Sequence, residues 1–234
     1  MEAIILCGGE SKRMKPYIPF NKALVDIKDG KTLLEYQVEW LRSNGVDHVV
    51  LAIDVETYTR LRDLKPELLD IVNCSIEERR LGTGGAVVKA LDLLSSDAFY
   101  LMNVDDIILS DEYEPKKLLD ILNDFDGALG SILLGGTRFP FGIVETESFR
   151  VVGFKQKPFL NFKVCTGHYA FKIEGVRKYF PLLGNFEDEA LQLMAVDGVL
   201  YSYELNGEWI TVNNVKQLEA ARKKLAAIDF YGEF

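Results

Sequence analysis

The first half of the chain alternates short apolar runs with amphipathic segments. Apolar runs at residues 2–7, 48–53, within 69–76 and at 98–104 predict buried strands. Helices are predicted between them: one at 33–44, a polar one after residue 53, and one at 84–94 that begins at glycines. Strands and helices therefore alternate about every 25 to 30 residues, which predicts a parallel, doubly wound α/β sheet.

The helix at 33–44 has clear signals at both ends. Thr32 is a good N-cap and Glu35 completes a capping box with it. Gly45 follows the last helical residue, as is common where a helix stops.

The pattern changes after Gly127. Strands are predicted at 128–134, 141–146, 150–156 and 165–173, with few helices between them. Helices follow near 174–181 and 187–196, then a strand pair at 199–211 and a last helix from about 215 to 228. We expect one domain over 1–234, a Rossmann-like doubly wound mixed sheet whose second half, 128–234, is more antiparallel than its first, 1–127.

Composition and charge narrow the function. The 234 residues have a net charge of −9, which argues against a nucleic-acid-binding face but allows a local basic pocket for a phosphorylated small molecule. Three cysteines lie far apart without CxxC spacing, so neither a zinc site nor a disulfide framework is indicated. No apolar run has the length of a signal-peptide core or a membrane span, and the cytoplasm is the expected location.

Glycines and cations gather in the loop after the first predicted strand. Gly8 and Gly9 are followed by Lys12, Arg13 and Lys22. Ligands of parallel α/β sheets bind beyond the carboxyl ends of the strands, where this loop and residues 77–85, 103–106 and 156–157 are expected. The loop matches neither GxGxxG nor the P-loop motif. Taken alone, it is either a tight turn with solvated lysines or a phosphate-binding loop.

Longer motifs resemble those of a known enzyme family. GGESKRM (8–14) resembles the G-G-x-[GS]-x-R-[LM] signature of nucleotidyltransferases that join a nucleoside triphosphate to a sugar 1-phosphate, and SIEERRLGTGGAVVKAL (75–91) resembles their second nucleotide segment. LMNVDD, FGIV, FKQKP, CTGHYAF and WITVNNVKQLEAA then follow in the family's order, over nearly the whole chain. The branch it looks most like contains mannose-1-phosphate and heptose-phosphate guanylyltransferases and N-acetylmuramate-phosphate uridylyltransferases.

This resemblance implies a nucleotide-binding first half and a sugar-phosphate-binding second half of a nucleotide-diphospho-sugar transferase fold. It also implies roles for single residues. Arg13 and Lys22 would bind the phosphates, and Asp105 would bind Mg²⁺. The remaining implied contacts are nucleotide binding by Gly8, Gly9, Glu77, Gly82 and Thr83, and sugar-phosphate binding by Gly142, Gln156, Lys157 and Thr166.

The implied reaction is attack by a sugar-phosphate oxygen on the α-phosphorus of the triphosphate, with pyrophosphate leaving. GTP is slightly favoured over UTP, because a carboxylate such as that of Glu77 can accept two N–H bonds from guanine. The expected partners are therefore a nucleoside triphosphate, a sugar 1-phosphate and Mg²⁺, with no nucleic acid and no membrane, and a homo-oligomer is left open.

Several positions depart from the family pattern. The departures are Asn21 for a proline, Val104 for a glycine, Gln156 for a glutamate, Cys165 for an asparagine, and Thr211 for the second metal-binding aspartate. A hydroxyl is a far poorer Mg²⁺ ligand than a carboxylate. Two alternatives therefore stand beside the enzyme: a catalytically impaired protein that senses nucleotide or nucleotide sugar, and nucleotidyl transfer to a non-sugar phosphate.

Residues 139–171 are rich in aromatic side chains. We expect Phe139, Phe141, Phe159, Phe162, Tyr169 and Phe171 to pack in the core. A sugar-stacking wall or a dimer face is the alternative for any that are exposed.

Overall fold

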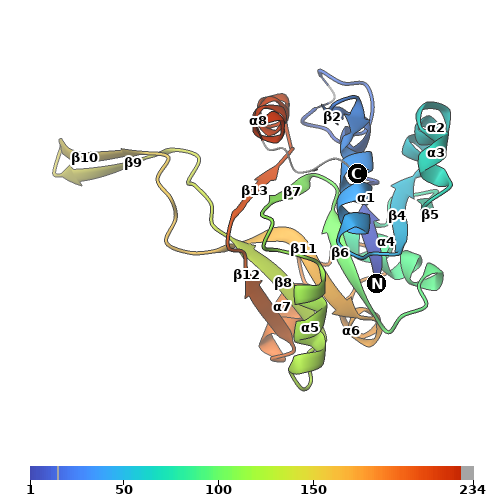
Figure 1. Cartoon of the computed structure of the whole chain (residues 1–234). Helices are drawn as coiled ribbons and strands as arrows, with labels where there is room; N and C mark the ends of the chain where they lie inside the picture. Colours follow the sequence, from blue (N-terminus) through green and yellow to red (C-terminus); the bar gives the residue numbers. More distant parts are fainter. Residues whose placement is uncertain (15, 228–234) are drawn as a thin grey trace.

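A seven-stranded sheet forms the centre of the computed structural model, which describes residues 1–14 and 16–227. Its order is β12-β8-β11-β6-β1-β4-β5, and β11 is antiparallel to both of its neighbours while the other neighbours are parallel (Figure 1). The strands are β1 (Glu2–Leu6), β4 (His48–Asp54), β5 (Asn73–Glu77), β6 (Ala98–Asn103), β8 (Gly130–Gly135), β11 (Val164–Lys172) and β12 (Leu200–Glu204). The prediction of a doubly wound mixed sheet is confirmed, with its antiparallel strand in the second half.

The central strands are apolar on both sides because helices cover both faces of the sheet. Along β1, Ala3 and Ile5 belong to one buried cluster and Ile4 to another, as the twofold alternation of a strand requires. The first cluster lies under α1 (Leu33–Ser43), α2 (Val55–Leu64), α3 (Pro66–Leu69), α5 (Lys116–Asp124) and α8 (Val215–Ala226). The second lies under α4 (Gly82–Ala90), α6 (Ile173–Tyr179) and α7 (Ala190–Val196).

The helix at 33–44 begins and ends as its sequence predicts. Thr32 accepts a hydrogen bond from the Glu35 backbone N–H, and the Glu35 carboxylate accepts one from the Thr32 backbone N–H. Gly45 adopts a φ of +78° just after the helix.

Short elements outside the main sheet were not all predicted. Short 3₁₀ turns occur at η1 (Lys22–Leu24) and η2 (Leu91–Leu93), and β2 (Asp26–Lys28) pairs with β3 (Lys31–Thr32). The predicted strand pair at 199–211 is two strands with different partners: β12 joins β8, whereas β13 (Glu208–Thr211) pairs with β7 (Asp106–Leu109). The β7–β13 pair places Thr211 and the segment between β13 and α8 next to the turn after β6.

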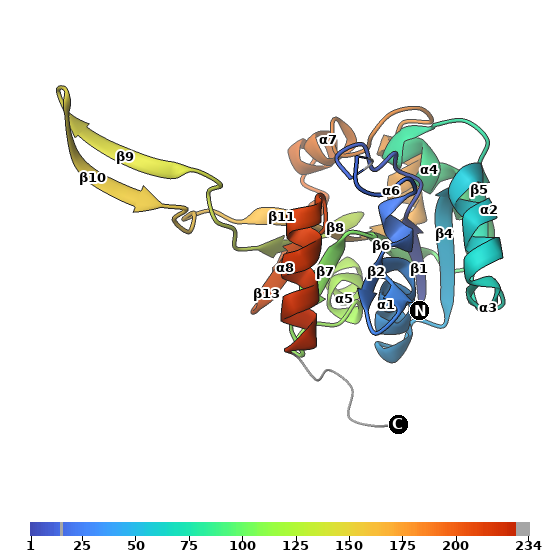
Figure 2. The same ribbon diagram turned by 90° about the horizontal axis from the view of Figure 1, so that it is seen from above.

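A long two-stranded arm projects from the body (Figures 1 and 2). It consists of β9 (Gly142–Glu147) and β10 (Arg150–Gln156), joined to the body by residues 136–141 and 157–163. The expectation that all the aromatics of 139–171 pack in the core is therefore wrong in part. Tyr169 and Phe171 on β11 are buried, but Phe139, Phe141, Phe159 and Phe162, at the arm's root, are exposed.

Among the described residues, no helix has both the length and the apolar composition needed to cross a membrane.

Candidate functional site

A cavity of about 340 Å³ opens where β1, β4, β5 and β6 end. It is lined by Ala52 of β4 and by the ends of β1, β5 and β6 with the loops that follow them, which is the position expected for a ligand of a parallel α/β sheet. The predicted residues that line it are Gly8, Gly9, Lys22, Glu77, Gly82, Thr83 and Asp105. Seven residues from three separate motifs therefore meet in one place.

The two glycines of the first loop differ in their surroundings. A Cβ atom at Gly8 would lie 3.1 Å from Glu77 Oε1 and 3.3 Å from the Asp54 nitrogen, so a larger residue would crowd the neighbouring strand ends. A Cβ at Gly9 would meet nothing within 4 Å. Gly8 is thus needed for packing, and Gly9 leaves its backbone open to the cavity.

Asn21 holds this loop in place. Its Nδ2 donates to the Cys7 and Gly9 carbonyls at 2.9 and 2.7 Å, and its Oδ1 accepts from the Ala23 backbone N–H at 2.9 Å. The side chain is buried and fully used, capping η1 at the same time. The sequence marked Asn21 only as a departure from the family pattern, whereas the structure gives it a positioning role.

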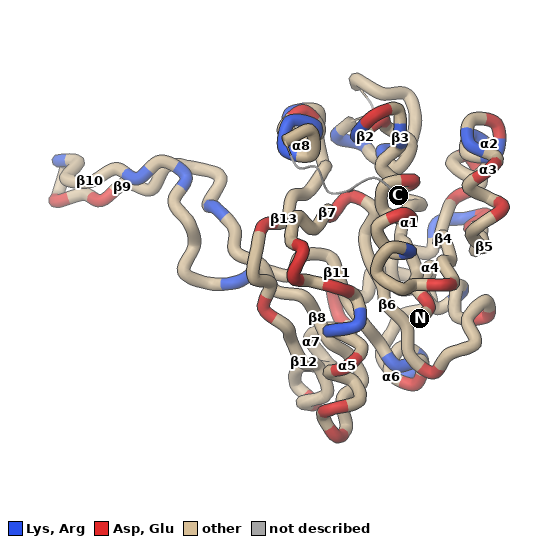
Figure 3. The backbone as a smooth tube through the Cα atoms, viewed as in Figure 1, with Lys and Arg blue, Asp and Glu red and all other residues tan. Residues whose placement is uncertain are grey.

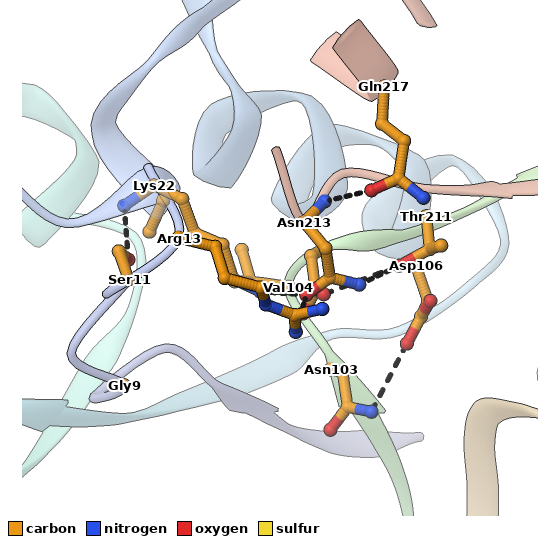
Figure 4. Close-up of polar contacts among 12 residues, drawn as sticks. Gly9, Ser11, Arg13, Lys22, Asn103, Val104, Asp106, Thr211, Asn213 and Gln217 are labelled. Carbon is orange, nitrogen blue, oxygen red and sulfur yellow. Dashed lines mark hydrogen bonds and ion pairs between the residues drawn. The ribbon is translucent and has the colours of Figure 1, made fainter. Parts of the chain in front are cut away.

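Lys22 and Arg13 converge on Asn213 (Figure 4). Asn213 Oδ1 accepts from Arg13 Nη2 at 2.8 Å and from Lys22 Nζ at 3.3 Å. Lys22 Nζ also lies 2.6 Å from Asp105 Oδ2, and both side chains are largely buried. The cations of the first loop therefore face the carboxylate that follows β6, although Arg13 itself is exposed and does not line the cavity.

Two carboxylates sit at a turn between β6 and β7. The backbone turns at Val104 and Asp105, so Asp105 and Asp106 do not follow the alternation of a straight strand. Burial, and after it the negative charge of Asp105, raise the pKa of Asp106 to about 7. Asn103 Nδ2 donates to Asp106 Oδ2 at 3.1 Å and works against this rise (Figure 4).

Buried side chains of other elements hold this turn. Gln37 Nε2 on α1 donates to the carbonyls of Val104 and Asp106 at 3.0 and 2.8 Å. His168 Nε2 lies 2.9 Å from the Asp106 carbonyl, so this nitrogen bears the proton, and Nδ1 accepts from the Tyr100 hydroxyl at 2.6 Å. Burial lowers the pKa of His168 to about 4, which keeps the ring neutral.

Gly167 leaves room for Asp106. It has a φ of +78°, and a Cβ atom there would lie 2.0 Å from Asp106 Oδ2. This contact gives a physical reason for the glycine of the CTGHYAF motif.

Thr211, which the motif resemblance aligns with the family's second aspartate, lies beside the carboxylates. Its hydroxyl lies 3.4 Å from Asp105 Oδ2 and accepts from Asn213 Nδ2 at 2.7 Å. Among the described residues, no group of three or more His, Cys, Asp or Glu side chains could hold a metal ion. The available ligands, two carboxylates and a hydroxyl, are hard oxygen donors that suit Mg²⁺ when nucleotide phosphates complete its shell.

The second nucleotide segment forms the opposite wall of the cavity. Burial raises the pKa of Glu77, while a hydrogen bond from the Leu81 N–H to Oε2 at 3.1 Å opposes the rise. Gly82 has a φ of +77°, and a Cβ there would lie 2.4 Å from the Gly184 carbonyl oxygen. The Thr83 hydroxyl donates to Glu187 and accepts from the Phe186 N–H at 3.2 Å. Loop 181–187 therefore supports this wall.

The predicted sugar-phosphate residues are not brought to the cavity. Gly142 and Gln156 lie opposite each other on the arm in the β9–β10 register, and Lys157 begins the segment that joins β10 to the body. Thr166 lies on β11 in the body, but it is fully buried and donates to the Leu133 carbonyl at 3.1 Å. The structure thus gathers the residues predicted to bind nucleotide at one cavity and leaves those predicted to bind the sugar phosphate away from it.

Two asparagines that contact the site were not predicted. Asn213 comes from the segment before α8, 200 residues after Arg13, and Asn185 accepts from the Thr83 N–H at 3.3 Å across the cavity mouth. In sequence, Asn213 is indistinguishable from its neighbour Asn214, which caps α8 by accepting from the Gln217 N–H at 3.0 Å. Only the β7–β13 pairing shows which asparagine faces the cations.

The MobA-like NTP transferase domain model matches residues 3–122. Curated relatives include mannose-1-phosphate guanyltransferase beta-A of Xenopus laevis, 31% identical over 92% of this chain and 62% of that protein. Mannose-1-phosphate guanylyltransferase 1 of Arabidopsis thaliana is also 31% identical, over 97% of this chain and 67% of that protein. The chain therefore spans roughly two thirds of the length of these relatives.

Solved structures share the fold. HddC of Yersinia pseudotuberculosis superposes with a TM-score of 0.71 at 22% identity, covering 96% of this chain and 99% of that one, and it has also been solved with GMP-PN. A putative glucose-1-phosphate thymidylyltransferase of Bacillus anthracis superposes with a TM-score of 0.74 at 18% identity, covering 99% and 98%.

Proposed function

The chain belongs to the MobA-like NTP transferase family, and from this premise we propose that it joins a nucleoside monophosphate, taken from a nucleoside triphosphate, to a sugar 1-phosphate. The main support is the cavity at the strand ends, where Gly9, Lys22, Glu77 and Asp105 of separate motifs face one space. Relatives at 31% identity are named as enzymes that act on mannose 1-phosphate.

The proposed reaction is a single displacement at the α-phosphorus. An oxygen of the sugar phosphate forms the new P–O bond, the bond from the α-phosphorus to the α,β-bridging oxygen breaks, and pyrophosphate leaves with that oxygen. The protein's contribution is to position the two substrates and to stabilise the negative charge on them.

The first loop is proposed to bind the triphosphate. Backbone N–H groups near Gly8 and Gly9 would donate to phosphate oxygens. Lys22 would leave its pair with Asp105 for the α-phosphate, and the Arg13 guanidinium would hold the leaving pyrophosphate through two parallel hydrogen bonds. On binding, Lys22 would exchange its contact with Asp105, and Arg13 its contact with Asn213, for contacts with phosphate oxygens.

Asp105 is proposed as the protein ligand of Mg²⁺, beside Asp106 and Thr211. When bound, the ion neutralises phosphate charge. Release of Lys22 from Asp105 frees a carboxylate oxygen for this role, so binding of triphosphate and binding of metal favour each other.

Glu77 is proposed to select the base. Its Oε2 accepts from the Leu81 N–H, and a carboxylate can accept both N–H groups on the Watson–Crick edge of guanine. GTP is therefore the proposed triphosphate, in agreement with the names of the relatives. Gly82 and Thr83 would line the base pocket.

We also propose that 1–127 and 128–234 act as one domain, the first half for the nucleotide and the second for the sugar phosphate. One buried cluster contains residues of both halves, among them Ile5, Met102, Leu133 and Ala170.

Pyrophosphate release tests this function. The purified chain is incubated with Mg²⁺, each of the common nucleoside triphosphates, and either mannose 1-phosphate or a small panel of other sugar 1-phosphates. Release is expected with GTP and mannose 1-phosphate, and Arg13→Ala should remove most of it. Binding of nucleotide without release from any pair would contradict the proposal and favour a nucleotide sensor.

A further inference from the structure

The β9–β10 arm is an amphipathic ribbon. Its register places Val144 opposite Phe154 and Thr146 opposite Val151 on one face. The other face has Ile143 opposite Lys155 and Glu145 opposite Gly153, with an ion pair of 3.2 Å between Lys155 and Glu145. One face is therefore largely apolar and the other charged.

The apolar face has no cover within the described chain. Phe154 is 63% exposed, Val151 59% and Val144 49%, and Phe149 at the tip of the hairpin is fully exposed. A two-stranded hairpin alone is at best marginally stable in water, and exposed apolar surface of this kind marks an interaction site. The arm therefore needs a partner.

The two segments that connect the arm to the body, 136–141 and 157–163, contact each other at the root of the arm. The Phe139 N–H donates to the Pro158 carbonyl and the Leu160 N–H to the Thr137 carbonyl, each at 2.9 Å. The Arg138 guanidinium stacks 4.1 Å from the centre of the Phe159 ring. These contacts hold the two connecting segments together, and the arm that follows them projects away from the body in both views (Figures 1 and 2). The partner surface is thus expected on another molecule.

Charge favours a second copy of the same chain. Residues 137–163 contain five Lys or Arg and two Glu, a net of +3, whereas the whole chain is −9, so the remainder is −12. Figure 3 shows Lys and Arg positions along the arm and its connecting segments, and Asp and Glu positions over much of the body. The arm of one copy and the body of another are therefore complementary.

We propose that two copies of this chain form a symmetric dimer in which each arm lies across the other's body, with Phe149 and the face of Val144, Val151 and Phe154 buried between them. Closed twofold pairing buries the same surface on both chains. This part of the proposal does not depend on catalysis.

A second step rests on the proposed function. Gln156 and Lys157, implied by the family resemblance to hold the sugar phosphate, lie at the end of β10 and in the connecting segment after it, and no residue of 136–163 lines the cavity at the strand ends. In the dimer, each arm would bring its Lys157 to the partner's Asp105 and Lys22. The sugar side of each site is then completed by the other copy.

The mass of the protein in solution tests the dimer. Light scattering after size exclusion should give twice the chain mass for the wild type, and the chain mass for Phe149→Asn and Val144→Asp. Ile143→Asp, the adjacent residue on the charged face, is the matched control and should remain dimeric. Circular dichroism checks that each variant is folded. A monomeric wild type, or folded dimers of both test variants, would overturn the proposal.

Complementation tests the exchange of arms. Arg13→Ala inactivates a body and leaves its arm intact, whereas Lys157→Ala does the reverse. Coexpressed at equal levels, they should recover about a quarter of wild-type pyrophosphate release, because half of the dimers are mixed and each has one complete site. No recovery, with both single variants dimeric and wild-type release intact, would overturn the exchange. Absence of release in the wild type would instead count against the proposed function.

Discussion

Lys22 and Asp105 form an ion pair inside the cavity, with Nζ 2.6 Å from Oδ2. The pair joins the first loop to the turn after β6, and Asn213 links Lys22 to Arg13. Without substrate, the site therefore neutralises its own charges. In the proposed reaction, a phosphate of the triphosphate replaces Asp105 as the partner of Lys22, and Mg²⁺ replaces Lys22 as the partner of Asp105. Before substrate binds, the ion pair therefore holds both groups at the place where the proposed reaction needs them.

Replacing Lys22 tests its proposed contact with the α-phosphate. Lys22→Ala should lower kcat/KM for GTP by at least about 100-fold, the usual cost of removing a group that stabilises charge in the transition state. Lys12→Ala is the control, because Lys12 is a cation of the same loop that is exposed and does not line the cavity. Equal kinetics for the two variants would contradict the role of Lys22.

Restoring a carboxylate at position 211 tests the metal site. Thr211→Asp should reduce the Mg²⁺ concentration for half-maximal activity by roughly tenfold, because carboxylates bind Mg²⁺ far better than hydroxyls. Without Mg²⁺ the same variant should unfold more easily, since a third carboxylate joins Asp105 and Asp106. Thr211→Asn serves as the uncharged control, and identical Mg²⁺ curves for all three proteins would exclude Thr211 from the metal's surroundings.

Asn21 is expected to position the glycine loop. Asn21→Ala should lower the free energy of unfolding by about 1–3 kcal/mol, because the carbonyls of buried Cys7 and of Gly9 lose their donor. Asn21→Asp keeps the acceptor for the Ala23 N–H but not the donated bonds. GTP affinity is measured by calorimetry. Loss of GTP binding in both variants would support the role of the donated bonds in positioning the loop. Wild-type affinity in Asn21→Asp would contradict that role and leave Asn21 only its role as the N-cap of η1.

His168 is expected to make stability pH-dependent in mildly acidic solution. Burial lowers its pKa to about 4 in the folded chain, against 6.5 when unfolded. Between these values only the unfolded state takes up the His168 proton, so His168 costs up to about 3 kcal/mol of stability as pH drops from 6.5 to 4. The raised pKa of Asp106 acts in the opposite direction over this range, in the wild type and in His168→Gln alike. Urea unfolding should therefore show that the wild type loses stability relative to His168→Gln as pH drops. The same pH dependence of unfolding in both proteins would assign that dependence to groups other than His168.

The strands and most helices could be predicted from the sequence because their signals are local. Alternation along β1 and the Thr32–Glu35 capping box depend on neighbouring residues alone. The direction of the arm could not be predicted in this way. The apolar residues of 139–154 have the pattern of core strands, and only their exposure in the structure shows that they leave the body (Figure 1).

For the site, the family motifs predicted which residues meet but not how they are paired. Gly8, Lys22, Glu77 and Asp105 do line one cavity. The contacts of Asn213 and His168 depend on strand pairings between distant segments, β7 with β13 and β11 with β6. Such pairings set the geometry around Asp105, and a motif does not encode them.

The fate of a labelled oxygen tests the central claim most directly. Mannose 1-phosphate carrying ¹⁸O on its phosphate is incubated with GTP, Mg²⁺ and the wild-type chain, and the products are analysed by mass spectrometry. We predict GDP-mannose that retains the label and pyrophosphate that contains none, because the sugar phosphate attacks the α-phosphorus of GTP. Labelled pyrophosphate, or no nucleotide sugar from a chain that binds GTP, would contradict the claim.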